Sequence, residues 1–137
     1  MKTTYKNLVI TAKLKESGVY FPNSTNSLRH NKFTVSVKNV DLKKQVRFDF
    51  YDSSKNFTEG IKGLSNEDLL NAFYCFVQDA IAGELSQDEF CNEFGYDYFD
   101  GRKIHRLCQK TAEKIEKIVI EDIYDFANDL QEATENL

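Results

Sequence analysis

The chain has 137 residues, of which 41% are hydrophobic and 29% are charged, and its formal net charge is −4 at pH 7. This length and composition favour one domain, residues 1–137, with a hydrophobic core of its own. The sequence contains no apolar run of membrane-spanning length, no signal-peptide pattern at its first residues, and three cysteines without a CxxC pair. We therefore expect a cytoplasmic protein, and exclude membrane proteins and disulfide-rich secreted proteins.

The charges are strongly segregated along the chain. Residues 1–62 are basic overall, residues 63–101 contain nine Asp or Glu and no Lys or Arg, residues 102–117 are basic again, and residues 118–137 contain six acids and no base. This layout indicates surfaces of opposite sign, which the net charge conceals.

Three stretches alternate apolar and polar residues with a period of two, the pattern of a half-buried strand: 5–14, 33–37 and 46–50. A turn is expected around residues 39–43, and hence a β-hairpin between the last two stretches. Residues 19–21 are expected to pair briefly with the sheet before Pro22 opens a polar connection, residues 22–32. The first part of the chain, 1–60, thus predicts a three- to four-stranded antiparallel sheet with one apolar face that needs a cover.

Capping signals divide the second part, 64–135, into three helices. Ser65, with Leu64 and Leu69 as a hydrophobic staple, predicts a first helix that ends at Gly83 and covers the sheet through a wide apolar face.

The second helix is short and the third is long. Ser86 and Glu89 form a capping box, and Gly95 is suited to close a helix of about two turns. After a new cap at Asp100 and Gly101, an apolar stripe continues to about Glu132 without Gly or Pro, which corresponds to about 45 Å of helix. Because a compact chain of this size has a diameter of roughly 36 Å, we expect the end of this helix to overhang. Its apolar residues, Ile123, Phe126 and Leu130, would then meet the sheet edge or a second copy in a homodimer. The predicted class is α+β, an antiparallel sheet followed and covered by three helices.

Two segments resemble a group of small proteins of phages and other mobile elements. They read GLSNEDLLNAFYCFVQDA (63–80) and DEFCNEFGYDYFDGRKIHRLCQKTAEKI (88–115). In that group a stretch EFCxEFGYD, an Asp-Ser turn, a helix start such as RKA and a later Cys-x-Lys recur, and this chain has residues 98–101 in place of the Asp-Ser turn. The resemblance covers roughly the C-terminal half and implies an accessory protein of a mobile element, acting in a bacterial host cell. It implies no activity for any residue.

Cys75, Cys91, Cys108 and His105 come nearest to a metal or catalytic set, and His105 and Cys108 are one helical turn apart. The cysteines fall on or beside apolar stripes, where a free cysteine behaves as a small hydrophobic side chain. Zinc requires four ligands in a tetrahedral array, and a catalytic thiol requires exposure and an orienting partner. We expect no metal, no cofactor and no catalytic residue, and hence a protein that is not an enzyme, with a zinc protein or small enzyme as a third hypothesis.

The leading hypothesis is a protein that binds another protein through acidic surfaces. The target would be a basic nucleic-acid channel of a host defence complex, as for an anti-CRISPR protein, with carboxylates placed where phosphates would lie. The candidate contact residues are Glu84, Asp88, Glu93, Asp97, Glu121, Asp125, Asp129 and Glu132.

The second hypothesis is a nucleic-acid-binding accessory protein that uses the polar face of the sheet. Basic and aromatic side chains on one surface are typical of single-strand binding. The residues expected there are Lys13, Lys38, Arg47 and Tyr51, joined by Tyr5 and Lys6. The alternative reading of this face is an ordinary solvated surface with charged edge strands.

Overall fold

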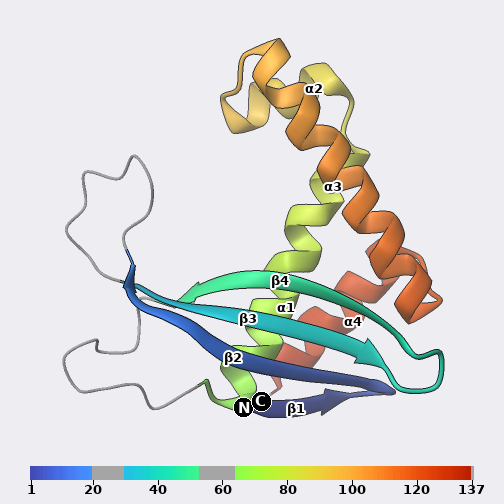
Figure 1. Cartoon of the computed structure of the whole chain (residues 1–137). Coiled ribbons are helices and arrows are strands. Elements are labelled where there is room, and N and C mark those ends of the chain that lie inside the picture. Colours follow the sequence, from blue (N-terminus) through green and yellow to red (C-terminus); the bar gives the residue numbers. More distant parts are fainter. Residues whose placement is uncertain (20–29, 53–63, 137) are drawn as a thin grey trace. The chain divides into compact units, whose positions relative to one another are not determined.

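The computed structural model describes residues 1–19, 30–52 and 64–136 (Figure 1). Within these ranges, four strands are followed by four α-helices and one short 3₁₀ helix, η2, so the predicted α+β class is confirmed. The strands are β1 (Lys2–Tyr5), β2 (Leu8–Val19), β3 (His30–Asn39) and β4 (Lys44–Asp52). The helical elements are α1 (Asn66–Ile81), η2 (Ala82–Glu84), α2 (Gln87–Phe94), α3 (Tyr98–Val119) and α4 (Ile123–Glu135).

The chain forms two compact units, Met1–Ala72 and Phe73–Leu137, whose boundary falls inside α1. Each unit is described below by itself. A single domain, and a sheet covered by the helices, both depend on how the two units are placed and stay predictions. Among the described residues, no helix has the length and apolar character needed to cross a lipid bilayer.

The first unit is built on an antiparallel meander in the order β1-β2-β3-β4. The predicted alternation places Ile10, Phe33, Val35 and Val37 in its core, each fully buried. The expected hairpin turn joins β3 to β4, where the buried Asn39 accepts hydrogen bonds from two backbone amides of the turn at 3.0 and 3.1 Å. An amide side chain is favoured here because it substitutes for backbone partners that the turn lacks.

Two features of the sheet differ from prediction. The expected strand 5–14 is divided between β1 and β2 by a tight turn in which Lys6 has a φ of 53°. Lysine is unusual in this left-handed region, and Asn7 is the one turn-favouring residue of this two-residue turn. Residues 30–32 of the expected connection 22–32 belong to β3, and the rest of that connection lies outside the described residues.

The start of α1 is capped as predicted. The Ser65 hydroxyl accepts a hydrogen bond from the amide of Asp68, and the Asp68 carboxylate accepts one from the amide of Ser65, both at 3.1 Å. Leu64 and Leu69 are both buried. The helix ends at Ile81, and Gly83, which was expected to close it, lies in η2 instead.

The prediction of one long helix with an overhanging end is wrong. The helix α3 begins at Tyr98, because Asp97 rather than Asp100 is the N-cap, and it ends at Val119. The next residue, Ile120, adopts the left-handed conformation with a φ of 51°. Asp122 then caps α4 by accepting hydrogen bonds from the amides of Tyr124 and Asp125.

The break turns α4 back onto the second unit. Ile123, Phe126 and Leu130 are at most 1% exposed, and the Phe126 ring lies 5.7 Å from that of Phe73. Because these side chains are buried within the chain, they leave little surface for a second copy. Contact of α4 with the sheet edge, and a homodimer formed through other surfaces, stay predictions.

Candidate functional site

The turn from α2 into α3 is fixed by caps at both ends of α2. The Ser86 hydroxyl accepts a hydrogen bond from the Glu89 amide at 3.2 Å and donates one to the Glu89 carboxylate at 2.9 Å. At the other end Gly95 takes the left-handed conformation, and its amide and that of Tyr96 both donate to the carbonyl of Cys91. The predicted capping box and glycine stop are therefore confirmed.

Phe90 is the centre on which this turn packs. Its buried ring lies 4.8 Å from that of Phe94, 5.8 Å from that of Tyr96, which is nearly parallel to it, and 5.2 Å from the His105 ring. His105 Nε2 is also 2.6 Å from the carbonyl oxygen of Leu85. We call residues 84–99 the α2–α3 corner.

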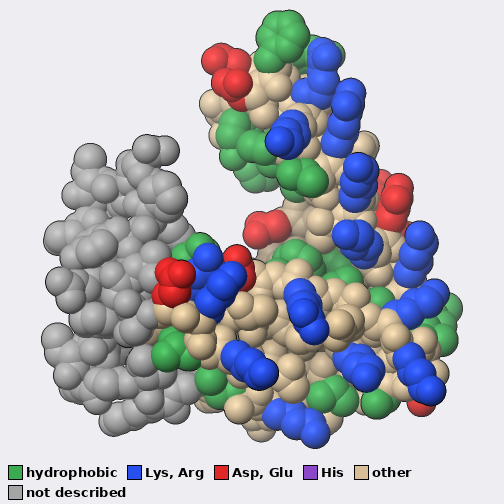
Figure 2. Space-filling view, in the orientation of Figure 1, with side chains coloured by type: hydrophobic (Ala, Val, Ile, Leu, Met, Phe, Trp, Pro, Cys, Tyr) green, Lys and Arg blue, Asp and Glu red, His purple; other side chains and the backbone are tan. Residues whose placement is uncertain are grey.

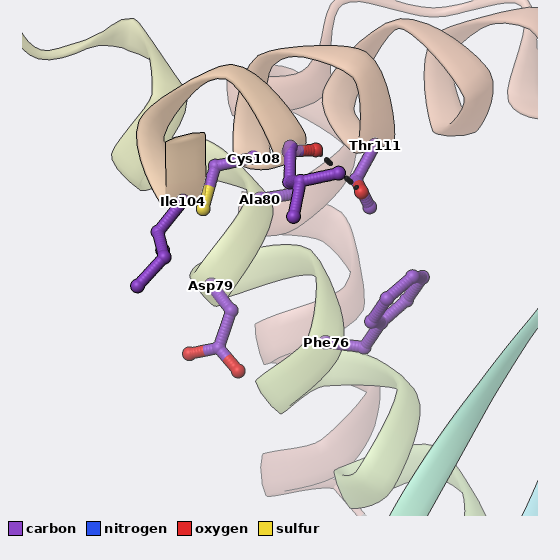
Figure 3. Close-up of a pocket in the computed structure, with 7 residues that line it drawn as sticks. Phe76, Asp79, Ala80, Ile104, Cys108 and Thr111 are labelled. Atoms are coloured by element: carbon purple, nitrogen blue, oxygen red, sulfur yellow. Dashed lines mark hydrogen bonds between the residues drawn. The ribbon is translucent and has the colours of Figure 1, made fainter. Parts of the chain in front are cut away.

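Two adjoining cavities lie beside the α2–α3 corner, between α1 and α3. The first has a volume of about 190 Å³ and is lined largely by Phe76, Leu107 and Thr111; the second has a volume of about 300 Å³ and reaches Phe90, Phe94 and Tyr96. Asp79, Ile104 and Cys108 line both. Figure 3 shows side chains of α1 and α3 that line the first cavity, Asp79 among them.

Asp79, whose carboxylate lines both cavities, has a raised pKa and influences the pKa of nearby thiols. Partial burial raises the pKa of Asp79 above its ordinary value of 3.8. Burial, and then the nearby Asp79 charge, raise the pKa of both the Cys75 and the Cys108 thiol. Asp79 is exposed as a residue, so its partly desolvated carboxylate is accessible to a ligand or partner, whereas a thiol with a raised pKa is a poor nucleophile.

The residues considered for a metal or catalytic set are dispersed. Cys75 is exposed on α1, while the thiol of Cys91 is buried, donates to the carbonyl of Asp97 and accepts from the Gln87 amide. Within the described ranges no three His, Cys, Asp or Glu side chains are grouped as metal binding requires. The expectation that the protein is not an enzyme stays a prediction.

The acidic candidate residues form two sets that differ in how exposed their side chains are. Glu84, Asp88, Glu93 and Asp97 are all exposed at the α2–α3 corner. In and before α4, Asp125 and Glu132 are exposed, whereas Glu121 and Asp129 are half-buried and already interact with other residues of the chain. The α2–α3 corner therefore offers the more available carboxylates.

Tyr124 links the two acidic sets. Its ring is 46% exposed, and its pKa is raised by burial and then by the nearby carboxylates of Glu84 and Asp122. Glu84 consequently lies within electrostatic range of the start of α4, although the two are about 40 residues apart in the chain.

Exposed aromatic side chains at the α2–α3 corner were missed as candidates. Phe94, Tyr96 and Tyr98 are 39–48% exposed, and Phe99 is 80% exposed. The Arg102 guanidinium lies 4.6 Å from the Tyr98 ring centre and 5.4 Å from that of Phe99. The sequence signal for this group is the run of aromatic residues within 96–99, directly after the helix stop at Gly95.

The second hypothesis places its four residues correctly on one face of the sheet. In the strand register Lys13 is opposite Thr34, Lys38 opposite Gln45, Arg47 opposite Ser36 and Tyr51 opposite Lys32, all on the face away from the core.

The sheet face is nevertheless less basic than expected. Lys32 on this face is 3.7 Å from the Asp49 carboxylate and also lies over the Tyr51 ring. Tyr5 does not belong to it, because it pairs with the buried Leu8 and so shares the core face, and Lys6 lies in the turn.

Asp79→Asn is expected to raise the free energy of unfolding at pH 7. The carboxylate is partly desolvated and lies in the last turn of α1, where the helix dipole disfavours a negative charge by up to about 1 kcal/mol. Because the folded-state pKa is raised, the folded chain binds the proton more tightly than the unfolded chain, so wild-type stability is lost as the pH rises through that pKa.

The difference should therefore shrink as the pH is lowered toward 4, in urea unfolding followed by circular dichroism. Asp88→Asn is the control, since Asp88 lies in the first turn of α2, where a negative charge is favourable. A destabilised Asp79→Asn protein at pH 7 would contradict this account.

No protein-family model, curated protein or solved structure matches this chain.

Proposed function

We propose that the protein acts without catalysis, by binding another protein through the α2–α3 corner. The observation that carries the proposal is the combination of an apolar cavity pair with one shared carboxylate, Asp79, and exposed aromatic and acidic side chains beside it. Interfaces depend on a few anchors that fill pockets, and aromatic residues and Arg are frequent among them. An apolar hollow with a carboxylate at its rim suits an Arg or Lys anchor, whose stem is apolar and whose end is cationic.

The class of partner follows from charge. Glu84, Asp88, Glu93 and Asp97 carry negative charge on a segment without Lys or Arg, which favours approach to a basic surface and discourages approach to an acidic one. A basic channel that holds nucleic acid is one such surface, and carboxylates can occupy the places of phosphates. Together with the resemblance to proteins of mobile elements, this supports a host defence complex as the target, in the bacterial cytoplasm.

Charge reversal at the α2–α3 corner tests the proposal. Glu93→Lys with Asp97→Lys is expected to abolish capture of the partner from a lysate of the bacterial host, because like charges facing each other at an interface cost several kcal/mol. Both residues are exposed and Asp97 makes no side-chain capping bond, so the circular dichroism spectrum should be unchanged.

The matched control is Lys13→Glu with Lys38→Glu on the sheet face, which should bind normally. If the sheet variant loses the partner and the corner variant keeps it, the contact surface is on the first unit and the proposal is wrong.

A further inference from the structure

The solvent side of α3 carries an uninterrupted row of bases, Lys103, Arg106, Lys110, Lys114 and Lys117, which we call the α3 basic row. At 100° per residue these five side chains fall within a sector of about 80°, and they extend over about 21 Å of helix. All five are exposed. Figure 2 shows Lys and Arg side chains following the course of α3 on the face in view.

No member of the row forms an ion pair with another described residue, although Glu113 lies three residues after Lys110 and four before Lys117. In the described part of the chain, none of its five members has a carboxylate within 4.0 Å. Successive members are three or four residues apart, so that each repels the next, and such like-charge neighbours destabilise a helix by about 0.2–0.5 kcal/mol per pair. A solvated helix face usually alternates its charges, which removes this cost. The repulsion is relieved when a polyanion lies along the row.

An aromatic residue continues the row at its N-terminal end. Phe99 is four residues before Lys103 and falls in the same sector of the helix. Its ring is 80% exposed, although the nearby Arg102 approaches it to 5.4 Å. Exposing a phenyl ring to water is unfavourable, and an unpaired nucleobase is a flat surface on which it can stack. A base in a duplex has both faces covered by its neighbours, so the ring favours a single strand.

We propose that α3 binds single-stranded nucleic acid, with the phosphates along the α3 basic row and one base stacked on Phe99. This site is distinct from the sheet face, where Lys32 is paired with Asp49. It shares Phe99 with the α2–α3 corner, but its five bases lie on α3 outside the corner and do not depend on the protein contact proposed there. An acidic protein surface would also be attracted by the row, but its carboxylates offer no flat surface on which the exposed Phe99 ring can stack.

The test measures binding of a fluorescent oligothymidylate of about 15 nucleotides by anisotropy between about 0.05 and 0.2 M salt. Each phosphate neutralised on a single strand contributes about −0.7 to the slope of log K against log salt, so five bases predict a slope of about −3.5. Lys110→Gln with Lys114→Gln should reduce the slope by about 1.4 and weaken binding about 25-fold at 0.1 M salt. Both residues are exposed and glutamine is a good helix former, so the fold should be retained.

A second variant separates stacking from charge. Phe99→Ala should weaken binding about tenfold without changing the salt slope, and Phe99→Tyr should restore it. The matched control for charge is Lys13→Gln with Lys38→Gln on the sheet face, which should leave both affinity and slope unchanged.

Four results would overturn the proposal. One is the absence of oligothymidylate binding at the lowest salt concentration, and another is a slope that falls in the sheet variant rather than the α3 variant. A duplex of the same length that binds as tightly as the single strand would exclude the stacked base. Polyglutamate that binds as tightly as the oligonucleotide would assign the row to an acidic protein surface.

Discussion

Truncation after Glu121 is expected to abolish cooperative unfolding of the second unit. The deletion removes α4, whose Ile123, Phe126, Ala127 and Leu130 are at most 3% exposed. Burial of each large apolar side chain contributes roughly 1.5–3 kcal/mol, and a whole domain is stable by only about 5–15 kcal/mol. The helices of the second unit should therefore no longer unfold in a cooperative transition. Thermal unfolding followed by circular dichroism would detect this loss.

A point variant tests the same contact without removing chain. Phe126→Ala should lower the free energy of unfolding by about 3–5 kcal/mol, because its ring packs 5.7 Å from that of Phe73. Truncation after Gln131 is the control, since the described residues beyond it are exposed or half-buried. If the chain ending at Glu121 keeps the wild-type melting temperature, α4 is not part of the core.

The sequence indicated the apolar residues of α4 but not that α4 is a separate helix whose apolar side is buried. The apolar stripe through Phe126 and Leu130 was recognised, yet it was assigned to an overhang because no Gly or Pro interrupts the segment. The helix breaks at Ile120, a β-branched residue in the left-handed region, where such residues are rare and strained. The available signal was Asp122, whose side chain caps the helix that follows. A capping residue such as Asp122 predicts where a helix begins. The burial of the apolar side chains of α4 offsets the backbone strain at Ile120.

Elements with local causes were predicted well. The alternation in β2, β3 and β4, the cap at Ser65, and the capping box and Gly95 around α2 each depend on residues near one another in the chain. The candidate site depends on contacts between distant segments. No spacing rule indicates that Asp79 shares two cavities with Cys108, or that Glu84 lies near Tyr124. The α3 basic row was readable from its three- and four-residue spacing, but only the exposure of its members and their lack of partners make it a candidate site.

Gly83→Ala is expected to be the most damaging single-methyl substitution at a described glycine. A Cβ atom at this position would lie 2.7 Å from the backbone carbonyl carbon of Cys108 and closer still to the amide nitrogen of Gln109. Backbone atoms cannot rotate away as a side chain can, so η2 and α3 would have to separate. Overpacking of a well-packed core typically costs about 1–3 kcal/mol, and we expect a value near the top of that range.

The displacement of η2 from α3 in Gly83→Ala should also disturb the α2–α3 corner. His105 lies 2.6 Å from the carbonyl of Leu85, two residues after Gly83, and Ala82 and Cys108 both line the second cavity. We therefore expect Gly83→Ala to weaken partner binding as well as to lower the melting temperature. Gly101→Ala provides the comparison, because its nearest neighbour is the Cys91 side chain at 2.7 Å rather than backbone. Combining Gly101→Ala with Cys91→Ala should recover part of the lost stability, whereas Cys91→Ala should not rescue Gly83→Ala. Equal losses for the two glycine variants, with no recovery in the Gly101 pair, would show that close approach of η2 to α3 does not determine the stability of this unit.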